Sequence, residues 1–246
     1  MMKKGNLIQW VVAVCLVLVT AYTAVHVHHA NQKNAIKMAK QAKLDKKAAK
    51  REKQLLKKIK RHERKPLSYE LSSLTMPYPN VRAKQYHNTK KHPYRLWVEV
   101  SLAKQRVYIK SGRYTLYTMN ASAAKNYDKG QKEYQKTPLG LFKLDKNRGQ
   151  AYFDATRGYG AKSWVSFTDG GLHRFESVPV NKDGQVIKAS AKQLGQKVTK
   201  KHNVKAYGSI RLSLADAQWF AENMPAKTPI FIHQDPKNHF PDDYEE

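Results

Sequence analysis

The sequence predicts a mainly β domain that is preceded by a membrane-spanning helix and a basic helical stalk. Residues 7–25 are almost uninterruptedly apolar and follow Lys3 and Lys4. Residues 31–65 are rich in Lys, Ala, Gln and Leu, with no Gly or Pro. From residue 94 onward, short apolar runs alternate with turn residues, and one helical pattern lies near the end. This alternation of short apolar runs and turn residues is typical of a β-rich domain.

Composition narrows the class of partner and excludes thiol chemistry. Lys and Arg total 46 against 19 acidic residues, a formal net charge of +27 over 246 residues. Such a surplus favours a polyanionic neighbour: nucleic acid, anionic lipid or the phosphate polymers of a bacterial wall. The membrane segment argues against nucleic acid. The single cysteine, Cys15, lies in the apolar run, so we expect no disulfide. His26, His28 and His29 could bind a divalent metal, but their position just after the apolar run is more simply explained by interfacial polarity, so we expect no metal or cofactor.

Residues 1–30 are predicted to be a transmembrane anchor. The 19 residues 7–25 are enough to span a hydrocarbon core. A cleaved signal peptide is the alternative, and a buried core helix is the least favoured of the three interpretations. More lysines follow the run than precede it, which favours a cytoplasmic C-terminus, but long domains translocate regardless of charge. We expect a single-pass cell-membrane protein with an extracytoplasmic domain, or a wall-secreted one if the signal is cleaved.

The remaining segments divide by composition. Residues 31–65 are interpreted as a helical stalk, either a solvated spacer or a surface for anionic lipid headgroups or wall polymers. In the second case each lysine contributes roughly 1 kcal/mol at low salt. Residues 66–93 are expected to be a linker and residues 236–246 an acidic tail. The domain itself, residues 94–235, is predicted to hold strands at 96–100, 106–109, 114–119, 164–167 and 229–233.

The segment 206–213 offers a candidate active site. Gly208 marks a short turn, and Ser213 is a plausible N-cap for a helix, with Asp216 three residues on. A glycine turn presents the next side chain and leaves backbone N–H groups available near it. That arrangement suits a nucleophile beside an oxyanion site, so Ser209 is the candidate nucleophile.

The same segment resembles the Ser-His-Gly-Cys-Ile-Arg-Leu signature of the L,D-transpeptidase (YkuD-like) catalytic domain, which cross-links peptidoglycan through an acyl-cysteine. Gly208, Ile210, Arg211 and Leu212 match, whereas the cysteine falls on Ser209 and the histidine on Tyr207. Residues 137–142 match the family's Thr-Pro-x-Gly-x-Phe element. The resemblance covers about residues 94–234. It implies a YkuD-like β-sandwich or barrel with one or two helices, acting on peptidoglycan peptide stems.

The family's upstream histidine has two possible equivalents. The sequence Phe-Glu-Ser-Val-Pro at 175–179 resembles a Phe-His-Ser-Val-Pro stretch of one branch, which places Glu176 at the histidine. Matching Gly-Leu-His at 171–173 to the family's Gly-Ile-His assigns the role to His173 instead. Either side chain is a candidate base for a serine, which needs one at neutral pH. Tyr207 has an ordinary pKa near 10 and is the weaker candidate.

Two further roles complete the predicted site. Gly208 is expected to supply an oxyanion N–H, and Arg211 to hold a substrate carboxylate or loop carbonyls. The sequence leaves two hypotheses open. In the first, the protein transfers an acyl group from wall peptide stems through Ser209. In the second, it is a catalytically inactive member of the family that binds peptidoglycan or wall polymers.

Overall fold

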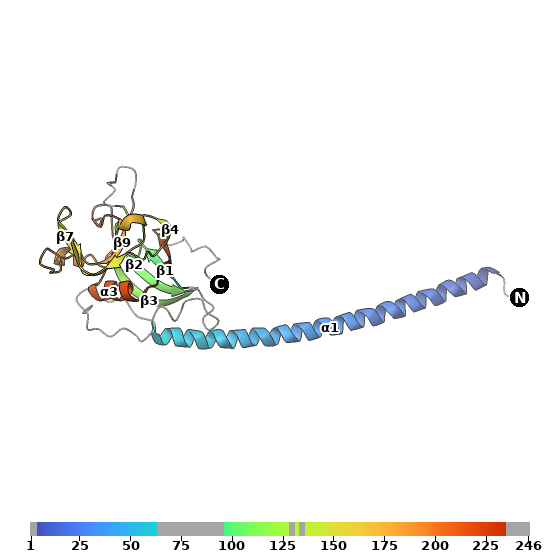
Figure 1. Cartoon of the computed structure of the whole chain (residues 1–246). Helices are drawn as coiled ribbons and strands as arrows, with labels where there is room; N and C mark the ends of the chain where they lie inside the picture. The colour runs from blue at the N-terminus through green and yellow to red at the C-terminus, as the bar shows by residue number, and fades with distance from the viewer. Residues whose placement is uncertain (1–3, 63–95, 128–130, 133–135, 235–246) are drawn as a thin grey trace. The chain divides into compact units, whose positions relative to one another are not determined.

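The computed structural model describes residues 4–62, 96–127, 131–132 and 136–234 (Figure 1). The chain divides into two compact units, residues 1–57 and 58–246. The predicted linker (66–93) and acidic tail (236–246) lie outside the described residues.

The first unit is built on one helix, α1 (Lys4–His62), of 59 residues. It runs without a break through the predicted anchor and stalk, since no Gly or Pro interrupts residues 7–62. The large apolar side chains described in the first half are exposed, for example Leu16 at 60% and Tyr22 at 72%. Among the described residues, α1 is the one helix long and apolar enough to cross a membrane, a property that a signal sequence shares.

The second unit is mainly β, as predicted. Nine strands form one mixed sheet in the order β4-β11-β1-β2-β3-β10-β9-β8-β5, and β6 and β7 form a separate hairpin. Most neighbours are antiparallel, but β1 pairs with β11 and β9 with β10 in parallel. The strands are β1 (Leu96–Ser101), β2 (Arg106–Ser111), β3 (Tyr114–Ser122), β4 (Gly140–Lys143), β5 (Arg148–Gly149), β6 (Tyr152–Asp154), β7 (Tyr159–Ala161), β8 (Trp164–Ser166), β9 (Arg174–Ser177), β10 (Ile210–Leu212) and β11 (Pro229–His233).

Among the described residues, three short helices accompany the sheet: η3 (Asp169–Gly171), α2 (Lys188–Ala191) and α3 (Leu214–Asn223). Helix α3 packs on β8 and β9, where the Phe220 ring stacks on Phe175 with centroids 4.5 Å apart. Trp219 packs edge-on against Tyr117 of β3 at 4.7 Å. Burying such large aromatic rings contributes roughly 1.5–3 kcal/mol each. The core therefore fixes β9 and β10, the two strands that carry the candidate site, against α3.

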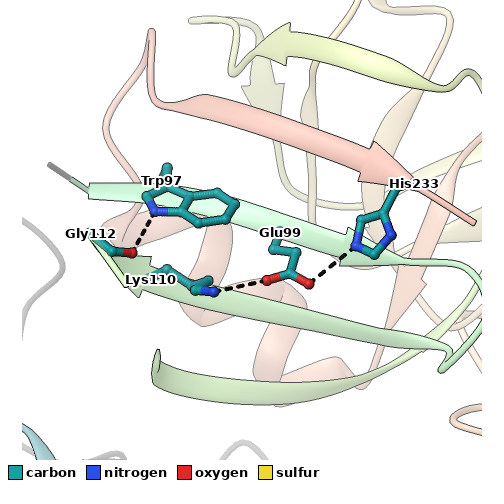
Figure 2. Close-up of polar contacts among 5 residues, drawn as sticks. All are labelled: Trp97, Glu99, Lys110, Gly112 and His233. Carbon is teal, nitrogen blue, oxygen red and sulfur yellow. Dashed lines mark hydrogen bonds and ion pairs between the residues drawn. The ribbon is translucent and has the colours of Figure 1, made fainter. Parts of the chain in front are cut away.

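The predicted strands at 96–100, 106–109, 114–119, 164–167 and 229–233 are confirmed as β1, β2, β3, β8 and β11. Strands β1, β2 and β11 are also joined by side chains across the sheet surface (Figure 2). Glu99 lies between Lys110 Nζ and His233 Nε2, each 3.1 Å from one of its carboxylate oxygens. The Lys110 ammonium also lies 4.8 Å from the centroid of Trp97, whose indole N–H donates to the Gly112 carbonyl at 2.8 Å.

Candidate active site

The predicted glycine turn is present and tight. Ser209 N–H donates to the Ala206 carbonyl at 2.9 Å, and the two residues between them have positive φ, +52° at Tyr207 and +81° at Gly208. Two successive positive φ values are those of a type I′ turn, which feeds directly into a strand. Here that strand is β10. Because the Ser209 N–H closes the turn, it is not available as an oxyanion donor in this arrangement. The oxyanion role expected of the Gly208 N–H stays a prediction.

The predicted helix start is confirmed as well. Asp216 N–H donates to Ser213 Oγ at 3.0 Å, so Ser213 is the N-cap of α3. An N-cap hydroxyl satisfies one of the unpaired amides of the first turn and contributes about 1 kcal/mol. The turn hydrogen bond before β10 and the Ser213 cap after it therefore hold this strand at both of its ends.

Ser209 directly precedes β10, and its side chain is buried. The residue is 1% exposed, and its Oγ accepts a hydrogen bond from Arg174 N–H at 3.3 Å. Within the part of the chain that the structure describes, neither His173 nor Glu176 is a hydrogen-bond partner of this hydroxyl. In this arrangement the hydroxyl therefore has neither predicted base as its proton acceptor.

His173 lies directly against the turn. A Cβ built on Gly208 would overlap the imidazole ring, so the ring occupies the space that a side chain at 208 would need. The histidine backbone is held on both sides, because its N–H donates to Thr168 Oγ1 at 3.0 Å and its carbonyl accepts from Phe167 N–H at 3.1 Å. Its ring stacks on Phe167 with centroids 6.1 Å apart.

The protonation of His173 follows from these surroundings. Burial, and then the positive charge of Arg157, hold the pKa of His173 below its ordinary value of 6.5. Its Nδ1 is buried and has no hydrogen-bond partner among the described residues. The imidazole is therefore neutral at pH 7, the form that accepts a proton.

Glu176 is placed differently. It is 1% exposed, accepts a hydrogen bond from Tyr152 Oη at 2.7 Å, and lies 3.6 Å from Arg211 Nε, an ion pair without a hydrogen bond. The pairing follows from the sheet, because Glu176 and Arg211 are opposite each other in the parallel β9–β10 register. Burial raises the pKa of Glu176 above its ordinary value, outweighing the opposing effects of Arg211 and Tyr152.

The two other predicted site residues, Arg211 and Tyr207, both lie next to the Tyr159 ring. Arg211 is 4% exposed, and its guanidinium lies 4.8 Å from the centroid of Tyr159. The contacts of Arg211 are thus with Glu176 and Tyr159. The Tyr207 ring lies between the guanidinium of Arg157, 4.7 Å from its centroid, and the ring of Tyr159, 6.1 Å away.

Sequence reasoning did not identify four residues that contact the predicted site residues: Tyr152, Arg157, Tyr159 and Arg174. The first three come from the β6–β7 hairpin, whose strands have three residues each. Strands this short show no alternation, and only the Gly158 turn signal marks the hairpin in the sequence. The position of Arg174 beside Ser209 depends on the parallel pairing of β9 with β10, which no local pattern predicts.

Comparison with known proteins assigns the family. The model of the YkuD L,D-transpeptidase catalytic domain matches residues 95–232. YciB of Bacillus subtilis (strain 168), itself assigned only provisionally as an L,D-transpeptidase, is 35% identical over 155 residues, covering 63% of this chain and 69% of that protein.

Solved structures show a weaker likeness. An L,D-transpeptidase from Mycobacterium tuberculosis H37Rv is 18% identical, with a TM-score of 0.41 and coverage of 56% of this chain and 57% of that one. An L,D-transpeptidase from Mycobacterium smegmatis is also 18% identical, with a TM-score of 0.40 and coverage of 56% and 58%. The chain thus spans under three fifths of the length of these two. The match to the family model and the 35% identity to YciB show that the chain belongs to the YkuD family of L,D-transpeptidase catalytic domains.

Proposed function

We propose that the protein transfers acyl groups between peptidoglycan peptide stems, with Ser209 as nucleophile and His173 as its base. The family supports a cell-wall function of the transpeptidase type. The observation that carries the finer assignment is the contact of the His173 imidazole with Gly208, the residue next to Ser209. A neutral imidazole at that position supplies what a serine lacks by itself, a proton acceptor at neutral pH.

The proposed reaction has two balanced steps. Ser209 Oγ bonds to a carbonyl carbon of the donor stem while its proton passes to His173. The bond from that carbon to the leaving amine then breaks, and His173 returns the proton to the amine. In the second step the amine of an acceptor stem attacks the acyl-serine, its proton passes to His173, and Ser209 is released with that proton. The Gly208 N–H is the proposed oxyanion donor.

In this scheme Glu176 and Arg211 position the site and do not exchange protons with the substrate. Both are nearly fully buried and contact each other across β9 and β10. A buried ion pair of this kind fixes the register of the strands that carry Ser209 and His173. Tyr207, whose ring packs between Arg157 and Tyr159, is proposed to line the ligand site rather than act as a base.

The test is product formation by the full-length chain in detergent, with disaccharide-tetrapeptide as substrate and chromatography with mass detection. We expect a cross-linked dimer from the wild type. The yield should fall at least 100-fold in Ser209→Ala and His173→Gln, because each removes one partner of the proton transfer. Ser190→Ala, on α2, is the matched control and should retain activity. Dimer formation by Ser209→Ala at the wild-type rate would contradict the proposal.

A second function, wall binding without turnover, is favoured by one observation. Ser209 is 1% exposed and its hydroxyl is engaged by the Arg174 amide. A binding module would retain affinity for sacculi when Ser209 is replaced by Ala, and its affinity would fall with added salt because of the +27 charge. Sedimentation with purified sacculi at low and high salt separates this function from acyl transfer.

Helix α1 is proposed to anchor the domain outside the cytoplasmic membrane through residues 7–25. Its second half presents exposed basic residues, among them Lys37, Lys40, Lys43 and Lys47, to anionic lipid headgroups or wall polymers. Protease treatment of intact cells tests the orientation, since an external domain is digested. Flotation with neutral and anionic vesicles tests the lipid contact, which should be strong only on the anionic ones.

A further inference from the structure

We propose that Arg157 binds the C-terminal carboxylate of the peptide ligand beside the Gly208 turn. The inference rests on the proposed function in one respect, that the ligand is a peptide stem. It adds a subsite for the anionic end of that stem, on a hairpin that contains neither the predicted nucleophile nor the predicted bases.

Two observations place Arg157 near the Gly208 turn. Its guanidinium carbon lies 4.7 Å from the centroid of the Tyr207 ring, on the residue before Gly208. On the other side, its charge is one of the two causes that lower the pKa of His173, whose ring covers Gly208. Arg157 therefore extends from the β6–β7 turn to Tyr207, the residue before Gly208.

The arginine is held in place by its own hairpin. Asp154 Oδ1 accepts hydrogen bonds from the Thr156 and Arg157 amides at 3.0 and 3.1 Å. Asp154 Oδ2 lies 3.3 Å from Arg157 Nε. A guanidinium has five N–H donors, so this contact leaves donors for a ligand. The side chain is 26% exposed, which permits contact with a bound molecule.

The two other arginines at the site are engaged elsewhere. Arg211, the carboxylate-binding residue predicted from the sequence, is 4% exposed and paired with Glu176. Arg174 donates its Nε–H to the Gly171 carbonyl at 2.8 Å and packs over the Trp164 ring at 4.6 Å. Of the three, Arg157 is thus the arginine whose guanidinium combines partial exposure with contact to a side chain of the turn.

The chemistry of the ligand matches this position. In a peptide attacked at its last amide bond, the reacting carbonyl and the terminal carboxylate belong to adjacent residues, whose Cα atoms are about 3.8 Å apart. A carbonyl at Ser209 therefore places the carboxylate near the residues that flank the turn. Arginine binds carboxylates through paired, charge-assisted hydrogen bonds. Such a bond corresponds to roughly ten- to a hundredfold in affinity.

The experiment measures binding separately from chemistry. The full-length chain carrying Ser209→Ala is titrated by calorimetry with a tetrapeptide stem and with the same peptide amidated at its C-terminus. We expect the carboxylate form to bind at least tenfold more tightly. Adding Arg157→Gln should bring the ratio of the two dissociation constants to about one, by weakening the carboxylate form alone. Arg157→Lys, which keeps the charge but not the paired donors, should give an intermediate ratio.

Arg113→Gln is the matched control, because Arg113 also stacks on a tyrosine, Tyr114, at 5.3 Å, but in the β2–β3 turn. It should leave the ratio unchanged. A tenfold ratio that persists in Arg157→Gln, or a wild-type ratio near one, would overturn the subsite. If the ratio collapses in Arg157→Gln while the wild-type chain forms no dimer, the subsite stands and the proposed acyl transfer fails. Circular dichroism of Arg157→Gln verifies that its fold is retained.

Discussion

The imidazole of His173 occupies the space beside Gly208 that any side chain at that position would need. The glycine is required twice, once for its φ of +81° and once for this contact. His173 therefore packs on the residue that directly precedes Ser209. The contact is thus the structural basis for assigning the base.

Gly208→Ala should lower stability and abolish dimer formation together. An alanine would adopt an unfavourable φ, at about 1–2 kcal/mol, and would also displace the His173 ring. Gly184→Ala is the control, because φ is +74° there but the nearest atom to an added Cβ is Lys162 Cε at 4.0 Å. Thermal unfolding of the full-length variants should show a lower stability for both Gly208→Ala and Gly184→Ala, with the larger decrease in Gly208→Ala. Dimer formation should be lost only in Gly208→Ala. Full activity in Gly208→Ala would show that dimer formation does not depend on the contact between His173 and Gly208.

The rate of dimer formation should fall on acidification with a midpoint below pH 6.5, because the pKa of His173 is lowered by burial and by Arg157. A lowered folded pKa also means that the contribution to stability is present above pH 6.5 and is lost as pH falls from that value through the folded pKa. Arg157→Gln should shift the midpoint upward. NMR titration of labelled histidine gives the pKa directly; an unchanged value in Arg157→Gln would place the guanidinium farther from the ring.

Arg211→Met should destabilise the domain by about 3 kcal/mol at pH 7, because it leaves the Glu176 carboxyl buried without its counter-charge. The double variant Arg211→Met/Glu176→Gln should recover most of this loss. Since the pKa of Glu176 is raised in the folded state, its ionisation equilibrium stabilises the fold below pH 4.5. This contribution to the free energy of unfolding is lost as pH rises through the folded pKa. The deficit of Arg211→Met should therefore shrink on acidification. Urea unfolding at pH 7 and pH 5 measures both effects.

Glu99→Gln should cost about 1 kcal/mol at pH 7, the order expected for a partly exposed ion pair. The pKa of Glu99 is lowered because the hydrogen bond from His233 and the charge of Lys110 outweigh desolvation by burial. Its contribution is hence present above pH 4.5 and is lost as pH falls through the folded pKa. Glu222→Gln, on the exposed face of α3, should change stability little. Equal unfolding curves for Glu99→Gln and wild type at pH 7 would show that the contact adds no stability.

The sequence was sufficient for the elements whose signals are local. The strand at 229–233 was predicted with the bounds of β11, and Ser213 with its role as N-cap, because a β-branched run and a capping residue act within a few positions. The separate anchor and stalk were predicted as distinct segments, whereas α1 is a single helix, since both compositions are helix-forming.

The candidate site was predicted in part for the same reason. Gly208 and Ser209 lie in one local turn, which the sequence marks clearly. The positions of Glu176 opposite Arg211 and of Arg157 beside Tyr207 come from strand pairing and hairpin placement, which join residues far apart in the chain. Consequently the sequence could name Glu176 and His173 as alternatives, but only the packed sheet places the carboxylate with Arg211 and the imidazole on the turn.

The most direct test of acyl transfer through Ser209 is the site of covalent attachment. The full-length chain is incubated with disaccharide-tetrapeptide, quenched in acid, digested and sequenced by tandem mass spectrometry. The account predicts a stem-derived acyl group on Ser209 itself, absent in Ser209→Ala and strongly reduced in His173→Gln. An unmodified Ser209 under conditions that yield dimer, or an acyl group on any other residue, would contradict it.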